Sequence, residues 1–231
     1  MIEIIPAILP KNYEELKNKI SLVRGFSTCV QIDICDGVVV KNKTWPFMSG
    51  PDLDYHFKKI LNEEEGLPFW EDMEFELDLM TVDAVRNFDV YTRLGIKRMV
   101  FHFSKEENIE EFRDFLEGID AYIKDNIEIG VAIELDQDIQ SIFPLVNYID
   151  FVQVMGIENI GYQGQDFSKK CIEYVKILKE KFPELIVSVD GGVTFNTALL
   201  LIDEGVDRLV IGSAIFDNED VLGTIERFRN L

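Results

Sequence analysis

The sequence predicts a (β/α)₈ barrel, and three features indicate it. Apolar, β-branched segments of strand length alternate with segments whose apolar residues recur every three or four positions. This alternation repeats eight times over 231 residues, a length at which such barrels commonly form one unit. No Ser/Gly-rich linker, composition change or short-period repeat divides the chain, so we expect residues 1–231 to form a single domain. A doubly wound parallel sheet is the structural alternative.

The expected strands are short apolar runs rich in Ile, Val and Phe, and an expected helix follows each of them. In order, the strands are residues 2–9, 29–34, 73–79, 97–103, 127–133, 149–155, 185–190 and 207–212. The helices are residues 12–23, 52–61, 83–95, 107–124, 138–146, 166–182, 196–205 and 218–228. The one long irregular segment, 36–51, follows the second strand, where a functional loop is expected.

Charge and composition limit the partners and the location. The net charge is −20, from 43 acidic and 23 basic residues without a basic run, which makes nucleic acid and anionic membranes poor partners. No apolar run approaches the roughly 18 residues of a membrane span, and the N-terminus lacks a signal-peptide pattern. Cys29, Cys35 and Cys171 are odd in number and widely spaced, which favours a reducing cytoplasm over disulfides or a thiolate zinc site.

Carboxylates are expected to converge at one end of the barrel. Residues two apart share a strand face, so Asp33, Asp78, Glu134 and Asp190 point inward near the C-terminal ends of four strands, where barrel active sites lie. The inward faces of these strands carry no Lys or Arg, so a bound cation or shared protons must compensate the buried charge. An all-oxygen set of Gln31, Asp33, Asp78 and Asp190 suits Mg²⁺, Mn²⁺ or Ca²⁺ better than zinc. Hydrated or protonated acids that bind nothing are the alternative.

Three glycine-containing loops at the same end are candidate phosphate sites. An acidic protein must hold a phosphate with backbone N–H groups rather than a lysine cluster, and glycines expose those groups. The loops are 161–165, 190–194 and 211–216. The candidate phosphate-binding residues are Gly164, Gly191, Gly192, Gly212 and Ser213.

Six motifs in matching order carry a resemblance to a known family. They are 6-PAIL-9, 31-QIDICDG-37, 78-DLM-80, 155-MGIENIGYQGQ-165, 189-VDGGV-193 and 211-IGSAIF-216. From end to end the chain resembles the ribulose-phosphate 3-epimerase family. The resemblance implies interconversion of ribulose 5-phosphate and xylulose 5-phosphate, or of a related ketose phosphate, with Asp33 and Asp190 as the acid/base pair and a divalent metal. It also implies a small phosphorylated sugar as ligand, in a substrate pocket formed by Ala7, Met80, His102, Glu134 and Met155.

The chain departs from the family pattern at the metal site. Gln31 and Asp78 stand where the family has its two metal-binding histidines, and Ala7 stands where it has a serine. Without both imidazoles, Mg²⁺ or Mn²⁺ is expected rather than Zn²⁺ or Fe²⁺, or no cation at all. Met80 and Met155 match the apolar cap of the family, with core packing as the alternative. For His102 we expect a packed or hydrogen-bonded role, with a substrate contact as the alternative.

Two other functions remain open at this point. The first is a non-catalytic phosphosugar-binding protein that kept the phosphate loops and lost the metal. The second is a metal-dependent lyase of the hexulose-phosphate synthase type, although 78-DLMTVD-83 has Met80 where that branch has a lysine. The sequence leaves the oligomeric state open, a homo-oligomer included.

Overall fold

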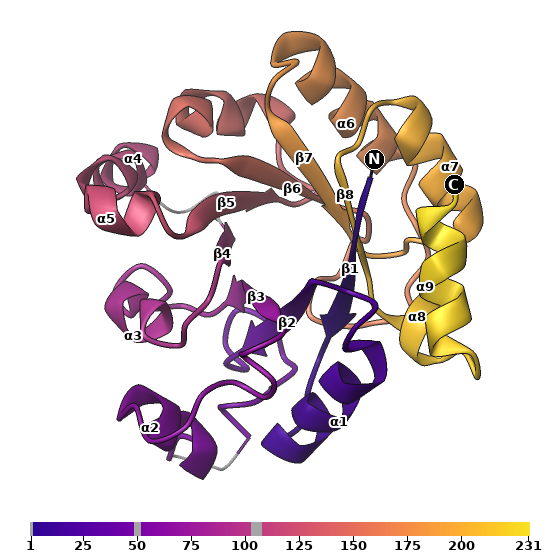
Figure 1. The fold of residues 1–231 in the computed structure, drawn as a ribbon. Coiled ribbons are helices and arrows are strands. Elements are labelled where there is room, and N and C mark those ends of the chain that lie inside the picture. Colours follow the sequence, from indigo (N-terminus) through magenta and orange to yellow (C-terminus); the bar gives the residue numbers. More distant parts are fainter. Residues whose placement is uncertain (1, 49–51, 103–107) are drawn as a thin grey trace.

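Eight parallel strands close into a barrel in the computed structural model, which describes residues 2–48, 52–102 and 108–231. The strands follow one another around the barrel in chain order, and β1 pairs with β8 to complete it (Figure 1). The (β/α)₈ prediction is therefore confirmed, and the doubly wound alternative is wrong because that sheet would leave two open edges. The strands are β1 (Glu3–Ile8), β2 (Cys29–Cys35), β3 (Glu74–Met80), β4 (Arg98–His102), β5 (Glu128–Ile133), β6 (Phe151–Met155), β7 (Ile186–Asp190) and β8 (Arg208–Ile211).

Helices surround the barrel, and several of them differ from the prediction. The expected helix 83–95 is helical only over Phe88–Thr92, and the short helix Ser213–Phe216 was not expected. The expected helix 107–124 breaks at Ile119, whose backbone is extended, and Asp120 caps a new short helix by accepting from the Tyr122 N–H. The expected helix 138–146 is a 3₁₀ helix with Pro144 inside it, because proline removes a backbone donor. The helical elements are α1 (Tyr13–Val23), α2 (Tyr55–Leu61), α3 (Phe88–Thr92), α4 (Ile109–Gly118), α5 (Ala121–Lys124), η1 (Ile139–Tyr148), α6 (Lys170–Lys181), α7 (Phe195–Asp203), α8 (Ser213–Phe216) and α9 (Val221–Arg229).

Parts of three expected elements lie outside the described residues. They are residue 103 of the fourth strand, residue 107 of the helix after it, and residues 49–51 of the loop after the second strand. No helix in the described ranges has both the length and the apolar character needed to cross a membrane.

The strand faces divide as expected from the alternation of side chains. Val30, Ile32 and Ile34 of β2 pack in the main apolar core together with residues of the surrounding helices. On the opposite face, Cys35 joins Met80 in a smaller apolar cluster inside the barrel. The polar residues of β2 and β3 that share this inner face with Cys35 and Met80 therefore point to the barrel axis.

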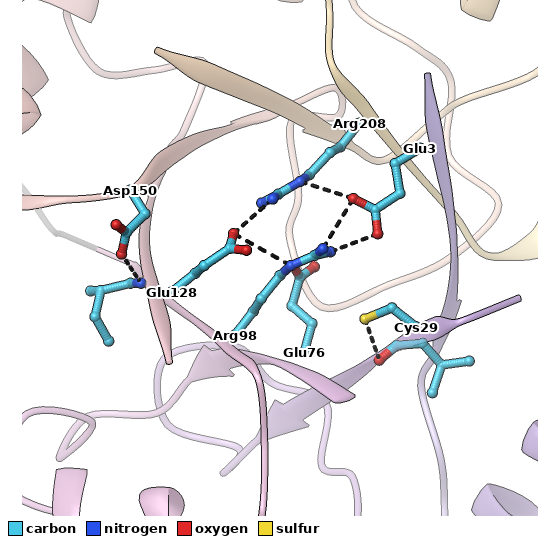
Figure 2. A network of polar contacts seen from close by, with 9 residues as sticks. Glu3, Cys29, Glu76, Arg98, Glu128, Asp150 and Arg208 are labelled. Carbon is cyan, nitrogen blue, oxygen red and sulfur yellow. Dashed lines mark hydrogen bonds and ion pairs between the residues drawn. The ribbon is translucent and has the colours of Figure 1, made fainter. Parts of the chain in front are cut away.

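A ring of charges fills the N-terminal end of the barrel (Figure 2). Arg98 of β4 binds Glu3 through two N–H groups at 2.9 and 3.1 Å, and Arg208 of β8 donates to Glu3 at 3.1 Å and to Glu128 at 2.7 Å. The inward arginines thus come from strands other than the four considered from the sequence. Glu76 of β3 lies beside this ring, with one oxygen 3.8 Å from Arg98. Burial raises the pKa of Glu76 to about 8, against the opposing effect of Arg98 and Arg208.

The loop after β2 is anchored at its end to the strand that precedes it. The Thr44 hydroxyl donates to the Asp33 carbonyl at 2.7 Å and accepts from the Cys35 N–H at 2.8 Å. Between these points the loop buries Val40 against Ile160 and the interior apolar cluster. The Asn42 side chain donates to the Gly161 carbonyl at 3.0 Å, so this loop contacts the loop after β6 at the C-terminal mouth of the barrel.

Candidate active site

Three aspartates from three strands meet at the C-terminal end of the barrel. Asp33 comes from β2, Asp78 from β3 and Asp190 from the last position of β7. One carboxylate oxygen of each lies within 4.8 Å of the others. Asp78 is fully buried and Asp33 is nearly so. Such a cluster needs positive charge or protons, because burial and mutual repulsion both disfavour the ionised forms.

The pKa values of two of these acids are raised. Burial and the Asp78 carboxylate raise the pKa of Asp190 to about 7, while the Gln31 hydrogen bond acts in the opposite direction. Burial, Asp190 and Asp78 together raise the pKa of Asp33 well above its ordinary value. Burial and repulsion within the cluster therefore favour the protonated forms of Asp33 and Asp190 more than in exposed carboxyl groups.

Gln31 bridges the two aspartates through its side-chain nitrogen. Nε2 donates to Asp33 Oδ1 and to Asp190 Oδ2, both at 2.8 Å. The other end of the amide, Oε1, is buried and has no hydrogen-bond partner. The sequence led us to expect this oxygen among the cation ligands, whereas in the structure the nitrogen faces the carboxylates.

Asp78 is paired with His102, which lies at the end of β4. His102 Nε2 is 2.6 Å from Asp78 Oδ1, and Nδ1 is 3.9 Å from Glu134 Oε1. Burial lowers the pKa of His102, but the Asp78 carboxylate outweighs it and raises that pKa to about 10. The Asp78 carboxylate therefore favours the protonated imidazole, whose positive charge would offset part of the negative charge of the cluster. The sequence led us to expect a packed or hydrogen-bonded role for His102 but did not indicate Asp78 as its partner.

The donor set also fits a hard divalent cation. Three carboxylates present oxygens within 4.8 Å of one another, and oxygen-only sets of this kind suit Mg²⁺ or Mn²⁺. The orphaned Gln31 Oε1 is a fourth oxygen of the right chemistry, and rotating the amide would exchange it with Nε2. His102 occupies Asp78 Oδ1, which leaves Oδ2, with one long 3.3 Å contact from Gln153 Nε2.

A small pocket, partly open to solvent, lies above the aspartates. None of its described lining residues is Lys or Arg. Gln31 and His102 lie outside this lining, and Glu134 lines a neighbouring groove with Lys41. The lining includes Asp33, Asp78, Asp190 and the sequence-predicted residues Ala7, Met80, Met155, Gly164, Gly191, Gly192, Gly212 and Ser213.

The loops that follow β7 and β8 line part of the pocket through Gly192 and Gly212. Gly192 has φ +67°, and a Cβ there would lie 2.8 Å from the Phe167 backbone. A Cβ at Gly212 would lie 2.4 Å from the Gln163 amide nitrogen, which also donates to the Ala7 carbonyl at 3.1 Å. Glycine is therefore required at position 192, whereas at position 212 a side chain would displace the Gln163 amide from its contact with Ala7. Gln163 itself was not among the sequence candidates, and its place in the 161–165 loop was the only signal for it.

Comparison with known proteins identifies the family of the chain. The model of the ribulose-phosphate 3 epimerase family matches residues 3–216. The chain belongs to this family. It is 27% identical over 229 residues to the ribulose-phosphate 3-epimerase of Schizosaccharomyces pombe, covering 99% of this chain and 92% of the relative. It is 26% identical over 235 residues to the ribulose-phosphate 3-epimerase of Bacillus subtilis, covering 99% of both chains.

Solved structures share the fold at lower identity. KGPDC from Streptococcus mutans has a TM-score of 0.70 at 15% identity and covers 99% of this chain and 96% of its own. A 3-hexulose-6-phosphate synthase has a TM-score of 0.66 at 15% identity and covers 99% of both chains. These similarities support the barrel fold alone. The chemistry has to be inferred from the residues of the site.

Proposed function

We propose that the chain is a sugar-phosphate epimerase that interconverts ribulose 5-phosphate and xylulose 5-phosphate or a related ketose phosphate. The observation that carries the proposal is the placement of Asp33 and Asp190, from β2 and β7, in one pocket with the glycine loops. Family membership supports the same reaction class. The ligand is then a small phosphorylated sugar.

Asp33 and Asp190 act as the acid/base pair in this proposal. One takes the proton from C3 on one face of the sugar, and the other returns a proton on the opposite face. Efficient proton transfer needs groups with pKa values near the working pH, and the pKa of Asp190 is raised to about 7 by burial and Asp78. With no cation bound, Gln31 holds the two carboxyl groups at a fixed separation through its two N–H groups.

A divalent cation, Mg²⁺ or Mn²⁺ rather than Zn²⁺ or Fe²⁺, is the proposed cofactor. Asp33, Asp78 and Asp190 would hold it, with Gln31 contributing its amide oxygen. When bound, the cation would stabilise the negative charge that develops on the substrate oxygens as the C3 proton leaves. His102 orients Asp78 by holding one of its oxygens.

Backbone N–H groups are proposed to bind the phosphate. Gly191, Gly192, Gly212 and Ser213 line the pocket together with Gly164 of the loop after β6. Because no cationic side chain is among the described lining residues, affinity for the dianion depends on these amides. Met80 and Met155 form the apolar wall beside the aspartates.

The proposal is tested by assaying purified protein with ribulose 5-phosphate in the presence of Mg²⁺ or Mn²⁺. We expect xylulose 5-phosphate with the wild type and none with D33N, because the amide cannot accept the C3 proton. Unphosphorylated ribulose is the matched control for the glycine loops and should react far more slowly. A folded wild-type protein that forms no epimer from any ketose phosphate would refute the proposal.

A non-catalytic phosphosugar-binding protein is the second candidate. The observation that favours it is the Gln31 amide, which satisfies both aspartates without a metal. Metal analysis of the purified protein and calorimetric titration with ketose phosphates separate the two candidates. Phosphosugar binding without turnover under any cation would favour this candidate over the epimerase.

We also propose a cytoplasmic location. All three cysteines are buried and unpaired, which suits a reducing compartment. A relative 26% identical over 218 residues is the cytoplasmic isoform of the rice ribulose-phosphate 3-epimerase. Cell fractionation with an antibody tests the location, and recovery of the protein outside the cytoplasmic fraction would contradict it.

A further inference from the structure

Two neighbouring side chains below the aspartates have buried polar atoms without partners. Gln31 Oε1 has none, and neither carboxylate oxygen of Glu76 has one. Gln31 and Glu76 stand opposite each other in the register of β2 and β3, both facing inward and both fully buried. Each such atom costs about 1–3 kcal/mol when left unpaired. The unpaired Gln31 Oε1 and the oxygens of an ionised Glu76 are all acceptors, so neither side chain satisfies the other with the amide in this orientation.

The surroundings of Glu76 do not supply the missing bonds. The nearest charged atom, Arg98 Nη1, is 3.8 Å from Glu76 Oε2, which is beyond hydrogen-bond distance. Arg98 is already bound to Glu3, and its Nε lies 3.4 Å from Glu128 Oε2. Figure 2 draws both contacts. An N–H donor on the side of Gln31 would satisfy Glu76 directly.

The Gln31 amide has one orientation that suits an empty aspartate cluster and another that suits a cation. With Nε2 toward Asp33 and Asp190, both carboxylates receive a hydrogen bond at 2.8 Å. A cation held by the same carboxylates would repel that NH₂ group and attract the carbonyl oxygen. The terminal torsion of glutamine is broad and roughly two-fold, so the two orientations interconvert without moving the backbone.

We propose that the Gln31 side chain is a two-position switch that couples the cation site to Glu76. Without a cation, Nε2 bridges Asp33 and Asp190. With a cation, the amide turns over, Oε1 faces the metal and Nε2 donates to Glu76. This inference rests on the cation of the proposed function and makes Glu76 a positioning residue that never contacts the metal.

A control residue is available on the other side of the barrel. Gln153 of β6 is also fully buried, donates to Asp78 and has an unpartnered Oε1. Its register neighbour on β7 is Ser188 rather than Glu76. Substitution of Gln153 should therefore act on the cation site independently of Glu76.

A double-mutant cycle on cation affinity tests the switch. Calorimetry with Mn²⁺ gives the Kd of the wild type, Q31M, E76M, Q153M and the double variants Q31M/E76M and Q153M/E76M, with circular dichroism confirming folding. We expect E76M to weaken binding about ten-fold, the size typical of a group that orients a metal ligand. Because Q31M already removes the switch, Q31M/E76M should bind no more weakly than Q31M. In Q153M/E76M, the fold-changes in Kd caused by the two single substitutions should multiply.

The outcomes separate the inference from the function on which it rests. Unchanged affinity in E76M, or multiplying effects of Q31M and E76M, would overturn the switch while leaving the epimerase and its cation in place. A wild type that epimerises but binds no Mn²⁺ or Mg²⁺ would overturn both the cation and the switch. If E76M does not fold, E76Q replaces it, because the isosteric amide keeps one acceptor oxygen for the Gln31 N–H and should show a smaller loss with the same non-additivity.

Discussion

The substitution Glu76→Gln should change how the stability of the protein depends on pH. Burial raises the pKa of Glu76 from an ordinary value of 4.5 to about 8. The folded state therefore binds this proton more tightly than the unfolded state does. The stability associated with that proton is complete below pH 4.5 and is lost as the pH rises toward 8. A pKa moved over this range corresponds to about 5 kcal/mol in total, or about 1.4 kcal/mol per pH unit.

Urea unfolding at pH 5, 6, 7 and 8 measures the effect. The glutamine side chain does not titrate, so the difference in unfolding free energy between E76Q and the wild type should grow in favour of E76Q as the pH rises. Glu74→Gln is the matched control, because Glu74 lies on the same strand and is exposed. The unfolding free energy of E74Q should change with pH in the same way as that of the wild type. Parallel curves for E76Q as well would refute the reasoning that Glu76 is buried without adequate partners.

Three further predictions concern the active site. Asp190→Asn should reduce turnover by about 10²–10⁴-fold with the fold retained, measured by steady-state kinetics, because an amide cannot act as acid or base; residual activity near the wild-type level would contradict its role. His102→Gln should weaken Mn²⁺ binding about 10–100-fold in calorimetry, because Asp78 loses the partner that orients it; an unchanged Kd would contradict this. Gly192→Ala should raise KM for the phosphosugar, because a Cβ would lie 2.8 Å from a backbone atom beside the pocket. The control Gly25→Ala, at φ +81° with open space around it, should lower stability and leave KM unchanged.

The barrel and its inward acids could be predicted because period-two alternation is a local signal. Ile32 and Asp33 fall on opposite faces whatever the rest of the chain does, and the C-terminal ends of parallel strands always meet at one mouth. The alternation of strands and helices along the chain places Gly191 and Gly212 in loops that follow neighbouring strands. These positions needed no knowledge of strand register.

The contacts between side chains could not be predicted because they depend on register and rotamer. The Asp78–His102 pair requires knowing how far β3 is shifted along β4, and the charge ring requires Glu3 and Arg208 to meet across the β1–β8 closure. The Gln31 amide gives no sequence signal for which end faces the acids. The 3₁₀ form of η1 likewise follows from Pro144 in its packed context, since apolar spacing alone also fits an α-helix.

Solvent deuterium incorporation tests the central claim most directly. Ribulose 5-phosphate is incubated with the wild type, D33N and D190N in D₂O containing Mg²⁺ or Mn²⁺, and the C3 position of the recovered ketose phosphates is followed by NMR. Two-aspartate proton transfer predicts deuterium at C3 of xylulose 5-phosphate with the wild type and loss of that product in both variants. Full exchange in both variants, or no deuterium at C3 with a folded and cation-loaded wild type, would contradict the account.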